Sequence, residues 1–334
     1  MFNRNKFLVI LFFGVISSSL YSQNIIRIGA SQTNKTIDQA LTTLGGTTIT
    51  QPQLLLLQAD YNSSLETIPL NISAQPGASA TRTITIKPDV GVTKTISGSV
   101  DGGAVIKFRG ASFFIIDGSN TTNGTSRDLT IINTSNNSVD FENDKNYNSN
   151  SVIWVSTNAL GAPSRNNTVK NCKVQGYRNG SALTVVTGIL VHGPTWLPSP
   201  DDTSEAQYFA YDNAFNTVIQ NNEITNIRVC GIAAIGLGFG RRDTGLVVNN
   251  NIVGSANVSG SGPRWFGIYI VRQNKARVSN NEIVGMSFPA SESEKIDNSL
   301  FNQKSFGLVC FINTNCQFNN NLIHNISNFK NNTQ

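Results

Sequence analysis

Short segments in which apolar and polar residues alternate recur through the second half of the chain. A shared pattern, apolar-x-Asn-Asn-x-apolar, fits segments 169–174, 219–224, 247–252, 278–283 and 317–322. Cys172 replaces the second Asn of the first segment, and Gln317 breaks the leading apolar position of the last. The segments are rich in Val and Ile and are too short for helices. They therefore predict short β-strands that bend at the Asn pair.

The Asn pairs are interpreted as corners of the fold rather than as ligand positions. Asn tolerates the left-handed backbone that a tight turn between strands requires. Identical residues stacked on neighbouring coils also form ladders of side-chain amides. The leading asparagines of the pairs are Asn171, Asn221, Asn249, Asn280 and Asn319.

A second repeated element, Gly-Ile/Leu-x-apolar or a related sequence, precedes these segments. It begins at Gly188, Gly231, Gly267 and Gly307, and segment 152–155 is a degenerate version. The distance from this Gly to the next leading Asn varies from 12 to 33 residues. Fixed elements separated by variable inserts are typical of a solenoid whose loops leave a constant coil. No helical pattern links them, so we predict an all-β fold, a single-stranded right-handed parallel β-helix with strands stacked about 4.8 Å apart.

The first half continues this pattern less regularly and begins with a helix. Thr36 opens a capping-box sequence, and Ile37, Ala40, Leu41 and Leu44 share one helical face, which predicts a short helix that caps the open end of the solenoid. Short strands are predicted at 54–58, 83–87, 95–97, 105–108, 113–117 and 129–133.

The extreme N-terminus has the features of a secretory signal. Arg4 and Lys6 precede an apolar run over residues 7–16, and Ser22 is a plausible last residue before cleavage. We expect residues 1–22 to be a signal peptide, 23–60 to form the N-terminal cap and first strand, and 61–334 to form the β-helix. A short membrane anchor is the alternative for the apolar run. We predict a secreted or cell-surface protein with no transmembrane segment after signal removal.

The composition limits which classes of binding partner and metal site are expected. The net charge of +5 falls to +3 when Arg4 and Lys6 leave with the signal, which is too weak to favour nucleic acid and is compatible with acidic polysaccharides. The four cysteines, Cys172, Cys230, Cys310 and Cys316, lack CxxC spacing. Cys310 stands in an apolar run and is expected to be buried, while a Cys310–Cys316 disulfide is the alternative. The chain has only two histidines, so a structural zinc site is not expected.

Several segments resemble the pectin-lyase-like superfamily of right-handed parallel β-helix proteins. They are 54–61 (LLLLQADY), 83–89 (TITIKPD), 113–118 (FFIIDG) and the two later repeats, and the resemblance covers roughly residues 25–334. Asp60 departs from the Gly that many members have there. The resemblance implies the fold but no single activity, because the superfamily includes lyases, hydrolases, esterases, epimerases, phage spikes and non-catalytic adhesins. Asn331, Asn332 and Thr333 look like the start of another turn, so we expect an incomplete last coil that a C-terminal module or partner covers.

The strongest cationic candidate is the sequence Arg241, Arg242 and Asp243, which follows the Gly-rich segment 236–240. Guanidinium groups pair bidentately with carboxylates, so this cluster is the candidate catalytic site for a uronate substrate. A solvated loop with an Arg–Asp ion pair is the alternative.

Acidic and aromatic residues in the inserts supply the other candidates. Asp201, Asp202 and Glu205 are candidate Ca²⁺ ligands, and Trp196 and Tyr208 beside them are candidates for stacking on sugar rings. An ordinary charged surface loop is the alternative there.

Arg264 and Trp265 also stand where a strand begins and are candidates for glycan contact, although packing of the Trp under a loop fits the sequence equally. Asp117 precedes a Gly and is interpreted as the end of a strand rather than as a catalytic carboxylate.

Two functions remain open on the sequence. The first is a non-catalytic scaffold that binds glycans or another extracellular surface through its inserts. The alternative is a polysaccharide lyase, or a related carbohydrate-active enzyme, that acts on an acidic polysaccharide. A lyase needs a Lys or Arg base of lowered pKa and a cation that neutralises the uronate carboxylate, for which Ca²⁺ is the candidate cofactor.

Overall fold

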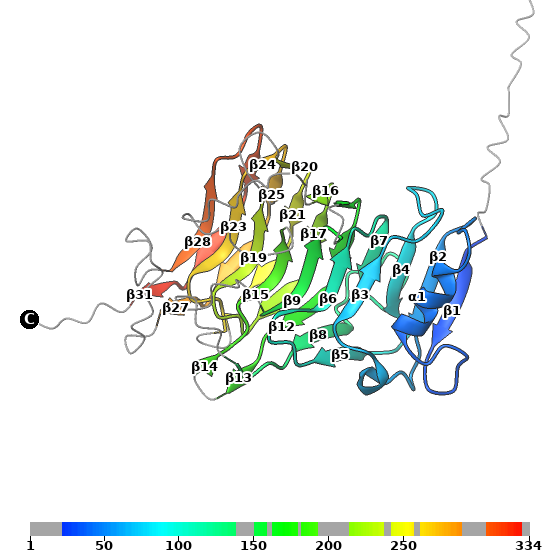
Figure 1. Ribbon diagram of the computed structural model, residues 1–334. Coiled ribbons are helices and arrows are strands. Elements are labelled where there is room, and N and C mark those ends of the chain that lie inside the picture. Colours follow the sequence, from blue (N-terminus) through cyan, green and yellow to red (C-terminus); the bar gives the residue numbers. More distant parts are fainter. Residues whose placement is uncertain are drawn as a thin grey trace, which may run out of the picture.

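Parallel strands stacked coil upon coil form the body of the protein (Figure 1). The computed structural model describes residues 22–137, 150–158, 162–179, 182–192, 214–236, 242–256, 261–288 and 305–328. The body has three sheets, here named A, B and C, and each full coil passes through them in the order A, C, B. Its strands pair in register with those one coil earlier and one coil later.

Sheet A contains β1 (Asn24–Ile28), β2 (Gln53–Leu57), β4 (Ile84–Pro88), β7 (Phe114–Asp117), β11 (Thr168–Lys170), β17 (Val218–Gln220), β21 (Val247–Asn249), β25 (Arg277–Ser279) and β29 (Gln317–Asn319). Sheet B contains β3 (Leu70–Ser73), β6 (Gly103–Arg109), β9 (Asn150–Ser156), β15 (Thr187–Val191), β19 (Cys230–Ile235), β23 (Phe266–Val271) and β28 (Phe306–Phe311). Sheet C contains β5 (Lys94–Gly98), β8 (Leu129–Asn133), β12 (Cys172–Gln175), β18 (Glu223–Thr225), β22 (Ile252–Val253), β26 (Glu282–Val284) and β30 (Leu322–His324).

Shorter strands also pair between neighbouring coils. A small parallel sheet joins β10 (Ser164–Arg165), β16 (Ala214–Phe215), β20 (Asp243–Thr244) and β24 (Gln273–Asn274) between sheets B and A. The strands β27 (Ser287–Phe288) and β31 (Ser327–Asn328) pair in parallel, whereas β13 (Arg178–Asn179) and β14 (Ala182–Leu183) form an antiparallel pair. This coil order confirms the right-handed parallel β-helix.

Columns of aliphatic side chains fill the interior. On sheet A, Val169, Ile219, Val248 and Val278 follow one another in register and are fully buried. The repeated glycines of sheet B are required by the same close packing of neighbouring coils. A Cβ atom on Gly267 would lie 2.4 Å from the carbonyl oxygen of Gly307 and equally close to a buried Ile side chain, so no larger residue fits.

Asparagines turn the chain sharply from sheet A to sheet C. Asn171, Asn221, Asn250, Asn280 and Asn320 all have φ between 52° and 59°, the left-handed conformation expected at these corners. The next residue forms the ladder: the side-chain amide of Asn222 donates to Oδ1 of Asn251 at 3.0 Å. Asn251 donates in turn to Asn281 at 2.9 Å.

In two of the predicted pairs the second asparagine, not the leading one, turns the corner. Asn249 and Asn319 end strands of sheet A, and Asn250 and Asn320 turn the corner instead. Both lie in runs of three asparagines, which offer two registers to a sequence pattern. The register is set by the apolar residues Val248 and Phe318, which pair with Val278 and face the interior.

The predicted helix is present as α1 (Ile37–Gly45), beside β1 and β2 at the N-terminal end of the stack (Figure 1). The Thr36 hydroxyl accepts a hydrogen bond from the Gln39 backbone, and the Gln39 side chain accepts one from the backbone of Lys35. All four predicted apolar residues of the helix are buried in the core. The six strands predicted in the first half are β2, β4, β5, β6, β7 and β8, with ends shifted by no more than two residues.

Burial decreases at the last described coil. Cys310 is exposed, so the expectation that it is buried was wrong, because no later described strand covers β28. On β30, Leu322 is 58 % exposed for the same reason. The four cysteines are free thiols. Within the described residues no helix is long and apolar enough to cross a bilayer. The predicted signal peptide and the predicted turn at residues 331–333 lie, except for Ser22, outside the described residues.

Candidate functional site

Most of the site residues predicted from the sequence lie in segments outside the described residues. These are Arg241, Trp196, Tyr208 and the candidate Ca²⁺ ligands Asp201, Asp202 and Glu205. Among the described residues, no group of three or more metal-ligating side chains comes together.

The remaining predicted residues are described, and three of the four are buried. Asp243 begins β20, where its carboxylate accepts hydrogen bonds from the Ala214 backbone at 3.2 Å and the Gln273 side chain at 3.3 Å. It therefore joins three neighbouring coils. Arg242, next to it, is half-buried. Trp265 is only 1 % exposed and packs in an apolar cluster, and Arg264 is also buried.

That apolar cluster lies on the outer face of sheet B. Ile153 and Val155 point into the core, so Trp154 between them points outward. Trp154 is in register with Lys107 on β6 and with Leu190 on β15. Further along the sheet the outer cluster continues with Ala233 on β19.

The beginning of this face carries the chemically distinctive side chains, which we call the sheet B cluster: Lys107, Arg109, Trp154, Ser156 and His192. Arg109 and Ser156 are register partners. The His192 backbone donates to the Val155 carbonyl at 3.1 Å, so His192 continues the ladder next to Ser156. Three consecutive strands thus place an Arg, a Ser and a His in one column, beside the column that holds Lys107 and Trp154.

Lys107 is an unusual lysine. Its ammonium lies 3.6 Å from the centroid of the Trp154 ring and forms no hydrogen bond or ion pair with any described residue. Burial, assisted by the nearby positive charge of Arg109, lowers the pKa of Lys107 to about 8. An amine that exchanges its proton near neutral pH is suited to proton transfer, and a desolvated cation without a carboxylate attracts anions.

Ser156 and His192 are fully buried, and each has an atom without a partner among the described residues. The Nδ1 atom of His192 lies 2.7 Å from the Ile235 carbonyl oxygen, while Nε2 has no partner. The Ser156 hydroxyl likewise has none. Burial lowers the pKa of His192 to about 4, so the ring is neutral at pH 7. The Trp154 indole also donates to the His192 carbonyl at 3.1 Å, which ties the two columns together.

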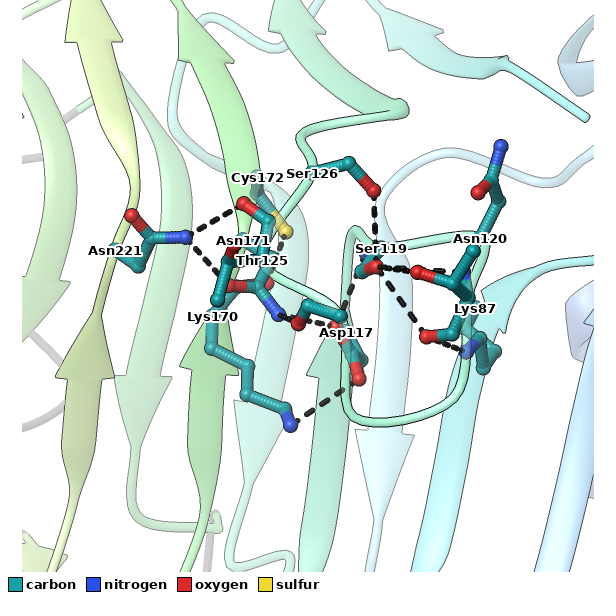
Figure 2. A network of polar contacts seen from close by, with 12 residues as sticks. Lys87, Asp117, Ser119, Asn120, Thr125, Ser126, Lys170, Asn171, Cys172 and Asn221 are labelled. Atoms are coloured by element: carbon teal, nitrogen blue, oxygen red, sulfur yellow. Dashed lines mark hydrogen bonds and ion pairs between the residues drawn. The ribbon is translucent and has the colours of Figure 1, made fainter. Parts of the chain in front are cut away.

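A second polar group lies on sheet A around Asp117 (Figure 2). The carboxylate accepts hydrogen bonds from the Ser119 backbone at 3.0 Å and from the Asn171 side chain at 2.6 Å. Its other oxygen lies 3.2 Å from the Lys170 ammonium. Burial lowers the pKa of Lys87, and the charge of Asp117 opposes that shift.

The Asp117 network secures the loop 118–128. Lys87 donates to the Thr121 carbonyl at 2.9 Å, and Asn221 donates to the Thr125 carbonyl at 2.8 Å. Because both Asp117 oxygens are already occupied by donors, this carboxylate is poorly placed to accept a substrate proton. The Asx turn to Ser119 matches the prediction that Asp117 ends a strand.

Sequence reasoning missed the whole sheet B cluster. Lys107 and Trp154 are separated by dozens of residues, and only the strand register brings them together. One signal was present. The segments 105–108, 152–155 and 188–191 were each recognised as strands, and aligning them by their inward residues would have placed Lys107, Trp154 and Leu190 in one outward column.

No model of a known protein family matches the sequence, and a search of curated proteins found no match. Two solved structures are similar to this one. A pectin methylesterase from Aspergillus niger has 12 % sequence identity and a TM-score of 0.40 over 92 % of this chain and 90 % of that chain. The A-module of a mannuronan C-5 epimerase from Azotobacter vinelandii has 15 % identity and a TM-score of 0.37 over 87 % of this chain and 71 % of that chain. The assignment of the fold rests on the strand order and register described above.

Proposed function

We propose that this protein is a secreted or cell-surface β-helix that binds an acidic polysaccharide on the outer face of sheet B, where β6, β9 and β15 begin the cluster. The observation that carries the proposal is the pair Lys107 and Arg109. These two cations stand on the same face of one strand, and neither has a carboxylate partner among the described residues.

Their arrangement is unfavourable without an anion. Residues two apart on a strand are separated by about 6.6 Å, and the charge of Arg109 already disfavours the charged form of Lys107. A carboxylate bound between them would relieve this repulsion, and a guanidinium pairs with a carboxylate in a bidentate geometry. Arg109 is exposed, so it is available to a polymer that approaches from solvent.

Proton abstraction by Lys107 is the second candidate function. The lowered pKa of Lys107, about 8, favours it, because a neutral amine is then available near physiological pH. In a lyase reaction Lys107 would remove the proton next to a uronate carboxylate, while Arg109 would pair with that carboxylate. The proton would move to the Lys107 amine, the electron pair of the broken carbon–hydrogen bond would form the new carbon–carbon double bond, and the glycosidic oxygen would leave with a proton taken from water.

The predicted residues of the insert after His192 are part of the proposal. Trp196, Asp201, Asp202, Glu205 and Tyr208 all stand in the insert that follows β15 and His192 in the sequence. We propose that the aromatic pair stacks on sugar rings and that the acidic residues hold Ca²⁺, which would bridge them to the carboxylates of the polymer. Arg241, Arg242 and Asp243 remain a further proposed contact.

A panel of purified polysaccharides tests both functions. Polygalacturonate, alginate and glycosaminoglycans are compared with neutral glycans by affinity electrophoresis, with Ca²⁺ and with a chelator. Retardation by acidic polymers alone supports binding, and equal mobility in all gels contradicts it. The ultraviolet absorbance of an unsaturated product, abolished by Lys107→Met, would support the lyase reaction. Binding without that absorbance supports the scaffold.

A further inference from the structure

The outer face of sheet B is open to solvent at its N-terminal edge. The edge strand there is β3, which pairs in register with β6. Its outward residue Asn71 lies beside Lys107, and Ser73 lies beside Arg109. Asn71, Ser73 and Arg109 are exposed, and Lys107 is half-buried. A polymer can therefore reach the two cations from the β3 side without entering a cavity.

The groups that face Lys107 leave its positive charge uncompensated. Within the described residues, the two strands beside β6 offer only neutral side chains to this face, namely Asn71 and Ser73 on β3 and Trp154 and Ser156 on β9. On β6 itself the next outward residue is Arg109, a second cation. The two residues are about 6.6 Å apart along the strand, which is within the screening length of about 8–10 Å in physiological salt.

Lys107 changes its charge in a pH range in which its surroundings do not. Burial and the charge of Arg109 lower the pKa of Lys107 to about 8. The Arg109 guanidinium stays protonated throughout this range. The carboxylates of a polysaccharide stay ionised at any pH well above about 4. Between about pH 7 and about pH 9 the charge of Lys107 is therefore the variable one in an encounter between this site and an acidic polymer.

We propose that binding of an acidic polysaccharide at this edge of sheet B is coupled to proton uptake by Lys107, so that the site holds its polymer at neutral pH and releases it under alkaline conditions. This inference rests on the binding function proposed above and adds the regulation of the same site. Arg109 pairs with a carboxylate at every pH, whereas Lys107 adds an attraction that disappears when its amine is neutral.

The direction of the pH dependence follows from proton linkage. A bound carboxylate stabilises the ammonium form, so it raises the pKa of Lys107 above the value in the free protein. Between these two pKa values the complex carries more protons than the free protein and polymer together. The affinity must then fall as the pH rises through that interval, and each binding event takes up a fraction of a proton.

Isothermal titration of the full chain with the best ligand of the polysaccharide panel tests the coupling. We expect the affinity of the wild type to fall about fivefold between about pH 7 and about pH 9. Near the upper end of this range the heat of binding should vary with the ionisation enthalpy of the buffer, because the protein takes a proton from the buffer. At about pH 6 that buffer dependence should vanish, because Lys107 is already protonated.

Three variants assign the effect to Lys107. Lys107→Arg keeps a permanent positive charge that can still stack on the Trp154 ring, so its affinity should match the wild type at about pH 7 and stay constant up to about pH 9. Lys107→Gln should bind as weakly at both pH values as the wild type does at the higher one. Lys35→Gln, which changes an exposed lysine at the N-terminal end, is the control and should keep the fivefold loss of about the same size.

The outcomes separate this inference from the proposed function. Wild-type protein that binds the polymer equally well at both pH values, with no buffer dependence of the heat, would overturn the coupling and leave the binding function standing. A fivefold loss that persists in Lys107→Arg would also overturn it, because another group would then be titrating. Wild-type protein that binds no acidic polymer at any pH would overturn the binding function and the coupling together.

Discussion

The Lys107 ammonium stands 3.6 Å from the centre of the Trp154 ring, one strand further along sheet B. The face of the indole stabilises the charged amine, whereas burial and the charge of Arg109 destabilise it. The balance leaves a lysine that changes its charge close to physiological pH. Both residues belong to the face on which we place the function, so the titration of Lys107 reports on that site.

The reactivity of Lys107 should titrate with a midpoint of about pH 8. Acetylation by a limiting reagent, followed across pH by mass spectrometry, measures it. Arg109→Gln should raise the midpoint by removing a positive charge, and Trp154→Leu should lower it by removing the ring face. A midpoint near the ordinary lysine value of about 10.4, unchanged in Arg109→Gln, would contradict the described environment.

The same shift has a consequence for stability. The pKa of Lys107 is lower in the folded than in the unfolded chain, so the unfolded chain binds more protons between these two pKa values. The free energy of unfolding should therefore rise from about pH 8 toward pH 10 in the wild type. Lys107→Met removes the titrating group and should remove this contribution to the rise.

The corner asparagines divide into two roles that substitutions can separate. Asn251 accepts hydrogen bonds from both the backbone and the side chain of Asn222, each at 3.0 Å, so Asn251→Ala leaves buried donors unsatisfied. We expect a loss of about 2–4 kcal/mol in urea unfolding. Asn250 has φ of 55° and is exposed, so Asn250→Gly should change stability by less than about 1 kcal/mol. Equal effects of the two substitutions would contradict the assignment.

The sequence predicted the corners and the helix because local chemistry dictates them. Left-handed backbone favours Asn, and the face that contains Ile37 and Leu41 needs a buried surface, so both features are visible in short windows. The register at Asn249 was not predictable from a run of three equivalent residues. It was decided by the burial of Val248 one position earlier. Cys310 was misjudged because its strand reads as apolar, while its exposure depends on which strands cover it.

The residues of the candidate site were harder to predict from the sequence than the fold, because they come together only through the pairing of distant strands. Inserts of variable length separate Lys107 from Trp154 and Ser156 from His192, so spacing along the chain carries little information about proximity. The sequence directed attention to charges in the inserts, such as Arg241 and Asp201. The described structure instead brings together residues of the strands themselves.

Asp117 should be a structural residue. Asp117→Ala removes the carboxylate that separates Lys87 from Lys170 and that secures the loop at Ser119. We expect a loss of about 2–4 kcal/mol in the free energy of unfolding, with no change in glycan affinity under conditions where the variant is folded. Loss of glycan binding by folded Asp117→Ala protein would instead make the network part of the binding site.

Glu66 connects the capping helix to the solenoid. Its carboxylate accepts a hydrogen bond of 2.6 Å from the Ile37 backbone and one of 3.0 Å from the Tyr61 hydroxyl. Burial raises the pKa of Glu66, and the hydrogen bonds from Ile37 and Tyr61 oppose this shift. The folded chain therefore favours the protonated form, so this contribution to stability is complete at low pH and is lost as pH rises through the folded pKa.

Glu66→Gln tests that contribution, because its amide oxygen can still accept from Ile37 and Tyr61. Chemical unfolding of the two proteins is compared from about pH 4 to pH 8. The wild type should lose stability relative to Glu66→Gln as pH rises. A wild type that gains stability relative to Glu66→Gln over this range would show that the hydrogen bonds outweigh burial.

The most direct test of the account is the affinity of an acidic polysaccharide for protein that lacks the two unpartnered cations of sheet B. Lys107→Gln/Arg109→Gln is compared with the wild type by isothermal titration with the best ligand of the polysaccharide panel. Arg27→Gln/Lys35→Gln removes the same charge from exposed positions at the N-terminal end and is the control. We predict that the first variant loses affinity by about tenfold or more and the control by less than about threefold. Equal affinity of all three proteins would contradict a glycan site on this face.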